Sequence, residues 1–185
     1  VVQMHHLYSS DIMADALAPK KISSPRSKPV NSTQLPANGS IMSGKRGLIM
    51  GVANDHSIAW GIAKTAAAQG AKLAFTYQSD SFAKRVEPLA NSVGASNLIE
   101  CDVSDPNSID LAFKTLKDDL GKLDFVVHAI AYSDKEELKG RYVDTSQENF
   151  LNTMNISCYS FTAVARRAAK MMNDGGSMVT LTYHG

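Results

Sequence analysis

The sequence predicts an α/β protein built on a doubly wound parallel sheet. From Lys45 onward, short apolar segments alternate with longer segments of helical composition, which is the pattern of βαβ units. The apolar segments are almost continuous, as in Gly-Leu-Ile-Met at 47–50 and Phe-Val-Val-His at 125–128, and this is typical of strands that helices cover on both faces. Right-handed crossovers then give the strand order 3-2-1-4-5.

Local signals place each element in turn. The first helix stops at Gly70, and Gly121 ends the third, because glycine favours the helix C-terminus. Ser104-Asp105-Pro106 starts the third helix with a capping side chain and a first-turn proline. Pro88 should shorten or kink the second. We therefore expect strands at 46–50, 72–77, 97–101, 124–129 and 177–182, and helices at 57–68, 79–92, 104–120 and 148–172.

Composition excludes several classes of protein. The chain has 185 residues, enough for one domain, and nineteen basic against eighteen acidic residues give a net charge of +1. Such balance gives no support to a nucleic-acid or membrane-surface protein, and no apolar stretch is long enough to span a bilayer. Cys101 and Cys158 lack zinc-ligand spacing, so we expect buried, reduced thiols and no metal.

The first 41 residues differ from the rest. They hold four of the six prolines, many serines and no sustained apolar period, so they cannot bury enough surface to offset the entropy of ordering. We interpret residues 1–41 as a disordered leader, either without function or an organelle transit peptide. Residues 42–185 form a partial Rossmann-type dinucleotide-binding domain, whose sheet is incomplete at its C-terminal edge.

The turn after the first strand is the first candidate ligand site. Gly51 permits a tight turn, Ser57 can cap the helix whose N-terminus favours phosphate, and Gly61 lets that helix approach the sheet. The turn lacks the G-x-G-x-x-G pattern. An ordinary strand-to-helix turn with a serine cap therefore remains an alternative.

The tips of the next three strands strengthen the case for a dinucleotide, because ligands bind beyond the carboxyl ends of such strands. Gln78 ends the second strand, and the absence of a basic residue there favours NADH over NADPH. After the third strand, Asp102 can accept a hydrogen bond from the adenine amino group while Val103 packs on the ring; a plain loop carboxylate is the alternative. Small, apolar residues around Ile130 would admit the nicotinamide ribose.

These segments resemble the NADH-dependent enoyl-acyl carrier protein reductases, a divergent branch of the short-chain dehydrogenase/reductases. The resemblance covers about residues 43–185 and none of the leader. It is carried by Ser-Gly-Lys-Arg at 43–46, GVANDHSIAWG at 51–61, LAFTYQ at 73–78, Cys-Asp-Val at 101–103, the segment 127–131 and TLTY at 180–183.

The resemblance implies a role for each matching residue. Gly51, Ser57 and Ile58 would lie by the pyrophosphate, Gln78 by the adenosine, Asp102 and Val103 by the adenine, and Ile130 by the nicotinamide. Ser133 would begin the substrate-contacting loop, and Tyr183 would be the first of two active-site tyrosines. Ala131 departs from the glycine usual in the family, and Asn155 receives no chemical role.

The implied reaction is the NADH-dependent reduction of the double bond of an enoyl thioester on acyl carrier protein, in the cytoplasm and by a full-length homotetramer. Hydride attacks the β-carbon, and the phenol of Tyr183, neutral near pH 7, donates toward the developing enolate. The family also carries a second tyrosine and a lysine beyond this point, which the 185 residues lack. We therefore expect a C-terminally truncated fragment without reductase activity.

Two other functions remain open at this point. One is a non-catalytic NAD-binding protein, and the other is a short-chain dehydrogenase that acts on a carbonyl. A further expectation concerns the helix at 148–172, whose apolar side chains should form core and helix–helix contacts. They are Phe150, Met154, Ile156, Phe161, Val164 and Met171.

Overall fold

A five-stranded parallel sheet forms the centre of the molecule in the computed structural model, which describes residues 38–182. The strand order is β3-β2-β1-β4-β5, which confirms the predicted order. The strands are β1 (Arg46–Met50), β2 (Lys72–Tyr77), β3 (Asn97–Glu100), β4 (Leu123–His128) and β5 (Met172–Thr180).

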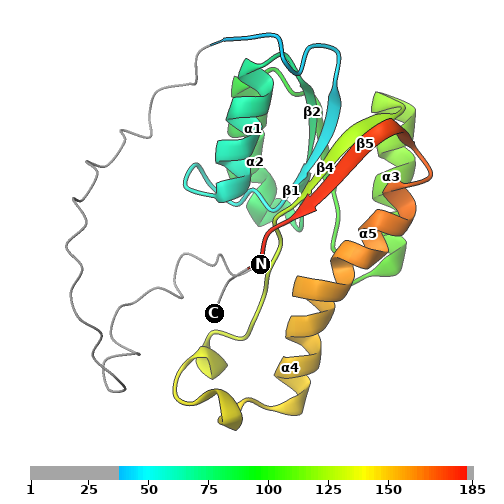
Figure 1. The fold of residues 1–185 in the computed structure, drawn as a ribbon. Helices are drawn as coiled ribbons and strands as arrows, with labels where there is room; N and C mark the ends of the chain where they lie inside the picture. The colour runs from blue at the N-terminus through cyan, green and yellow to red at the C-terminus, as the bar shows by residue number, and fades with distance from the viewer. Residues whose placement is uncertain (1–37, 183–185) are drawn as a thin grey trace, which may run out of the picture.

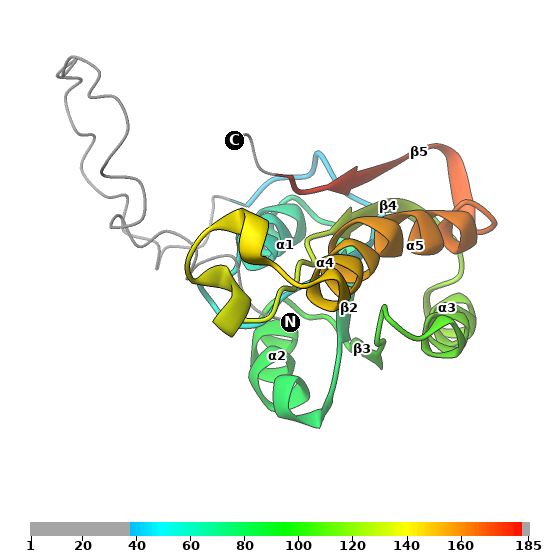
Figure 2. The ribbon, with the colours of Figure 1, turned by 90° about the horizontal axis from the view of Figure 1, so that it is seen from below.

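Helices cover both faces of the sheet (Figures 1 and 2). One layer contains α1 (Ile58–Ala68) and α2 (Asp80–Ser92), and the other contains α3 (Pro106–Leu120) and α5 (Ser160–Ala168). Helix α4 (Gln147–Met154) precedes α5 and extends beyond the end of the sheet (Figure 1). Because side chains alternate along a strand, Leu48 and Met50 join the core beneath α3 and α5, whereas Ile49 joins the core beneath α1 and α2. The sheet therefore separates two apolar cores.

The cap signals of the third helix are confirmed. Asp105 is the N-cap of α3, and its carboxylate accepts a hydrogen bond of 2.9 Å from the Asn107 N–H. Gly121, at φ 77°, follows the last residue of this helix. Pro88 lies inside α2 without shortening it, since the helix continues to Ser92.

The predicted helix at 148–172 differs most from the structure. It is divided into α4, a five-residue π-helical segment at Asn155–Tyr159, which we call the π turn, and α5. Residues beyond Ala168 leave the helix, and Met172 already pairs with Leu123 of β4. The pairing is then interrupted and resumes at Phe125 and Ser177, so β5 begins earlier than predicted and contains an irregularity at 173–176.

The burial of this region corrects two further expectations. Ile156, Val164 and Met171 are buried as predicted. Phe150 and Met154, however, are each 44% exposed, because within the described chain no element covers that side of α4. Cys101 is buried, but Cys158 is exposed, so only one of the two thiols is a core residue.

Part of the predicted leader falls within the described residues. Positions 38–41 are exposed, and the N–H of Gly39 donates to the Ala68 carbonyl at the end of α1. The leader up to residue 37, and Tyr183 at the other end, lie outside the described residues. Among the helices of residues 38–182, none is long and apolar enough to cross a membrane.

Candidate functional site

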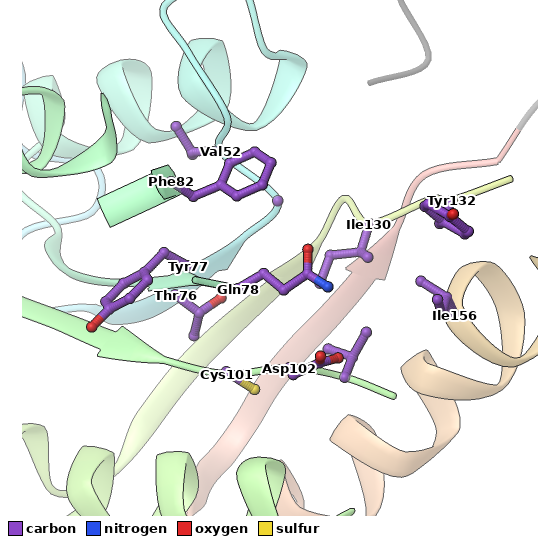
Figure 3. A pocket seen from close by; sticks show the side chains of 12 residues that line it. Val52, Thr76, Tyr77, Gln78, Phe82, Cys101, Asp102, Ile130, Tyr132 and Ile156 are labelled. Atoms are coloured by element: carbon purple, nitrogen blue, oxygen red, sulfur yellow. The ribbon is translucent and has the colours of Figure 1, made fainter. Parts of the chain in front are cut away.

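A pocket lies at the carboxyl ends of β1, β2 and β3 and at the loop after β4 (Figure 3). The empty space in it measures about 460 Å³, a figure that includes space open to solvent. Five of the predicted site residues line it, namely Gly51, Gln78, Asp102, Val103 and Ile130. The structure therefore brings together one predicted residue or more from each of the four loops.

Gln78 and Asp102 form the polar end of the pocket. Gln78 extends from the tip of β2, with Phe82 on one side and Asp102 on the other (Figure 3). Burial favours a higher pKa for Asp102, but hydrogen bonds from the Ser104 hydroxyl, the Ser104 N–H and the Gln78 side chain outweigh it and hold the pKa below its ordinary value. An ionised carboxylate only accepts hydrogen bonds, so Asp102 is suited to an amino group of a ligand.

Cys101 and Tyr77, which also line the pocket, stay uncharged. Burial and then the nearby Asp102 raise the pKa of the Cys101 thiol to about 12. Burial, followed by the charges of Glu100 and Asp80, also raises the pKa of Tyr77. These groups therefore supply neutral surface and no nucleophile at neutral pH.

Gly51 is required by the close approach of two strand ends. It has φ 97°, a conformation that side chains disfavour. A Cβ at this position would collide with the carbonyl of Ala129 beyond β4. The glycine thus brings the backbone after β1 against the backbone after β4 and shapes the floor of the pocket.

Ser57 and Gly61 do not act as predicted. Ser57 occupies the N-cap position of α1, but its hydroxyl caps no N–H of the helix; it accepts hydrogen bonds from the N–H groups of Ala53 and Asn54, at 3.0 and 3.1 Å. The residue therefore fixes the turn that precedes the helix. Gly61 is exposed, and a Cβ there would meet nothing within 4 Å, so the close packing of α1 comes from other positions, including Ala63.

Ile58 and Ser133 lie outside the residues that line the pocket. Ile58 is the first residue of α1 and is 59% exposed. Ser133 follows the pocket residue Tyr132, and its hydroxyl lies 3.2 Å from the amide nitrogen of the buried Asn149. The carbonyl oxygen of the same Asn149 side chain accepts from the N–H of Asp134 at 2.9 Å, which ties the start of this loop to α4.

An apolar wall forms one end of the pocket. It consists of Ile130, which was predicted, and of Tyr132 and Ile156, which were not. The periodicity of its segment predicts helix packing for Ile156, and only the tertiary arrangement brings this residue to the strand tips. Phe82, which also lines the pocket, had a usable signal, because an apolar residue in the first turn after a strand tip can fold back over that tip.

The pocket fits a dinucleotide such as NAD by its chemistry. Apolar side chains offer surface for flat rings, the polar end offers an ionised acceptor, and the backbone at Gly51 is accessible. No lysine or arginine is among the described residues that line the pocket. In the described part of the chain, no group of three or more histidine, cysteine or acidic residues could hold a metal ion.

Comparison with known proteins gives consistent matches. Residues 51–185 match the family model described as Enoyl-(Acyl carrier protein) reductase. The chain is 62% identical over 145 residues to enoyl-[acyl-carrier-protein] reductase [NADH] 2 of Rhizobium meliloti, covering 78% of this chain and 54% of that protein. The enoyl-[acyl-carrier-protein] reductase [NADH] of Rickettsia bellii is 53% identical over 145 residues, and the match covers 78% of this chain and 55% of that protein.

Solved structures agree with these matches. The Anaplasma phagocytophilum enoyl reductase, solved in complex with NAD, is 60% identical with a TM-score of 0.76, and the match covers 79% of this chain and 56% of that one. The homologue from Candidatus Liberibacter asiaticus is 58% identical with a TM-score of 0.77, covering 78% and 56%. The chain thus spans about half the length of the relatives it matches.

Proposed function

The chain belongs to the enoyl-(acyl carrier protein) reductase family, and on that premise we propose that the complete protein reduces the carbon–carbon double bond of enoyl thioesters on acyl carrier protein with NADH. The observation that carries the proposal is the convergence of Gly51, Gln78, Asp102 and Ile130 on one pocket at the strand tips. A ligand at this edge of the sheet follows the general rule for doubly wound folds.

Different residues of this chain would bind different parts of the NADH molecule. Gln78 and the ionised Asp102 would hold the adenosine half, and Val103 would pack against the adenine ring. Ile58 and the turn fixed by Ser57 would lie by the pyrophosphate. When bound, NADH would supply the hydride for the β-carbon of the substrate.

The substrate side of the proposal rests on two further residues. Ser133 would begin the loop that contacts the acyl thioester, and Asn149 fixes its position. Tyr183 would donate a hydrogen bond to the thioester oxygen as negative charge develops there, and losing one such donor typically costs about 2.7–4 kcal/mol of transition-state stabilisation. Water would supply the proton that the α-carbon takes up after hydride transfer.

We also propose that the complete enzyme is a cytoplasmic homotetramer. The support for assembly is the exposed apolar surface of α4 and the π turn, which includes Phe150, Leu151, Met154 and Tyr159, each 44–58% exposed. Exposed apolar patches on a protein surface are typical of protein–protein contact sites.

NADH oxidation, followed by absorbance with a crotonyl thioester as substrate, tests the activity in the full-length protein. We expect turnover with NADH and a saturated thioester as product. A non-catalytic NAD-binding protein would bind NADH without consuming it. A carbonyl-reducing dehydrogenase would instead oxidise NADH only with a ketone or aldehyde, and either result would refute the proposal.

A further inference from the structure

Tyr132 belongs to a segment that has no regular secondary structure, although it lines the pocket. After β4 ends at His128, the chain runs irregularly from 129 to 135. The side chain of Tyr132 lies beside Ile156 at the end of the pocket away from Tyr77 (Figure 3). Something other than a strand ladder must therefore hold this part of the wall.

The hydroxyl of Ser157 supplies that support. It accepts a hydrogen bond from the Tyr132 N–H at 3.0 Å and donates one to the Tyr132 carbonyl at 3.1 Å. One side chain thus satisfies both backbone polar groups of Tyr132. Because buried or half-buried backbone groups are costly to leave unpaired, this pair of bonds fixes the position of the wall residue.

The π turn that carries Ser157 is held in place by hydrogen bonds of Ser160, the residue that follows it. The Ser160 N–H donates five residues back to Asn155, as in a π-helix, and the Ser160 hydroxyl donates to the Ile156 carbonyl at 2.6 Å. The same hydroxyl lies 2.7 Å from Nε2 of His128. Its only proton is committed to Ile156, so His128 donates from Nε2.

His128 extends the anchor to the edge strand. Its Nδ1, left as an acceptor, lies 3.2 Å from the Thr180 hydroxyl of β5. Both His128 and Ser160 are fully buried. The ring of Phe161 packs edge-on against the imidazole of His128, with 5.5 Å between the two ring centroids. The π turn is therefore held rigidly against β4 and β5, and it presents Ile156 and Ser157 to the pocket.

We propose that Ser157 is a positioning residue for the reaction centre: through the backbone of Tyr132 it holds the apolar wall in the place that hydride transfer needs. This inference rests on the proposed function, in which that wall serves the nicotinamide and substrate half of the site. π turns inserted in α-helices occur frequently at functional sites, and displacing a reacting group by about 1 Å can cost up to about 100-fold in rate.

The test compares three variants of the full-length protein. Ser157→Ala removes both bonds to Tyr132, Ser157→Thr restores a hydroxyl, and Cys158→Ala changes the exposed neighbour in the same turn as a matched control. The measurements are kcat and KM with NADH and a crotonyl thioester, the Kd values for NAD and for ADP-ribose, and the thermal midpoint.

We expect Ser157→Ala to lower kcat by about tenfold or more and to weaken NAD binding, while ADP-ribose, which uses the polar end, binds as before. Ser157→Thr should recover most of the loss, and Cys158→Ala should match the parent. Equal weakening of NAD and ADP-ribose with a fall in thermal midpoint would reduce Ser157 to a structural residue and overturn the proposal, as would a Ser157→Ala variant that matches Cys158→Ala. If the parent itself consumed no NADH, the proposed function would fail, and the contrast between NAD and ADP-ribose would still decide whether Ser157 holds the wall.

Discussion

The buried His128 makes the stability of the protein sensitive to mild acid. Burial disfavours the charged imidazole and lowers its pKa from 6.5 to about 4. The described partners of the ring, the hydroxyls of Thr180 and Ser160, carry no negative charge that would offset this effect. As the pH falls, the unfolded chain takes up a proton on this histidine near pH 6.5, whereas the folded protein does not do so until about pH 4. The contribution of His128 to the free energy of unfolding is therefore fully present above pH 6.5 and is lost as the pH falls from 6.5 to about 4. Below that range this group causes no further change.

The magnitude follows from the two pKa values. At about 1.4 kcal/mol per pH unit, a gap from 6.5 to about 4 corresponds to about 3 kcal/mol of unfolding free energy. That is a large share of the total for a domain of ordinary stability, about 5–15 kcal/mol.

Urea unfolding followed by the fluorescence of Trp60, the only tryptophan of the sequence and a buried one, measures the effect at a series of pH values. The comparison is with His128→Gln, in which an amide replaces the titrating ring. We expect the parent to lose about 3 kcal/mol more than the variant between about pH 7 and pH 4. Acid groups such as Asp102 contribute equally to both proteins and cancel. Parallel curves for parent and variant over this range would show that His128 does not resist protonation and would refute the reasoning.

Three further predictions concern the pocket and the helix ends. Gln78→Arg should move cofactor preference toward NADPH by about tenfold in the ratio of kcat/KM values, because a guanidinium at this strand tip pairs with a 2′-phosphate; an unchanged ratio would contradict the placement of Gln78 by the adenosine ribose. Gly51→Ala should lower the free energy of unfolding by about 2 kcal/mol or more, because the new Cβ would be strained at positive φ and would collide with the Ala129 carbonyl. Gly61→Ala, whose Cβ would lie in open space, should instead raise it by about 0.5–1 kcal/mol, because alanine favours the helix. Equal effects of the two substitutions in denaturant titrations would be inconsistent with the structure. Asp105→Ala should cost about 1 kcal/mol through loss of the α3 cap, and a loss below about 0.3 kcal/mol in the same assay would argue against that cap.

Strands β1 to β4 and their tips were predictable because each has an apolar centre and ends at a clear change of residue type. Gln78 after Thr-Tyr and Asp102 after Cys101 are examples, and a parallel sheet necessarily brings such tips to one edge. Only the second half of β5 was predictable, since Asn-Asp-Gly-Gly at 173–176 has the composition of a turn. The division of the long helix was not predictable in the same way. The residues of Asn155–Tyr159 are all weaker helix formers, but weak propensity does not specify a π turn. The hydrogen bond between Ser160 and His128 that accompanies the wide turn joins residues 32 positions apart, so it has no local sequence signal.

Local chemistry with two outcomes explains the other differences. A serine hydroxyl before a helix can serve the helix or the preceding turn, and in Ser57 the turn prevails. Periodicity shows that Phe150 and Met154 share a face with other apolar residues, but it does not show what covers that face. Residues brought in from a distant element, such as Ile156, carry no signal in their own segment that marks them as part of a pocket.

The separation of the interior by the sheet has a practical meaning for anyone who redesigns this protein. Val126 packs on one side and Val127 on the other. The two layers meet at the pocket, which Val52 of one layer lines together with Val103 and Ile130 of the other. Away from the pocket, stability losses caused by replacing one distant residue on each side should add, without the coupling that neighbours in one layer would show. A library of replacements could thus be screened for each layer alone and the best members combined afterwards.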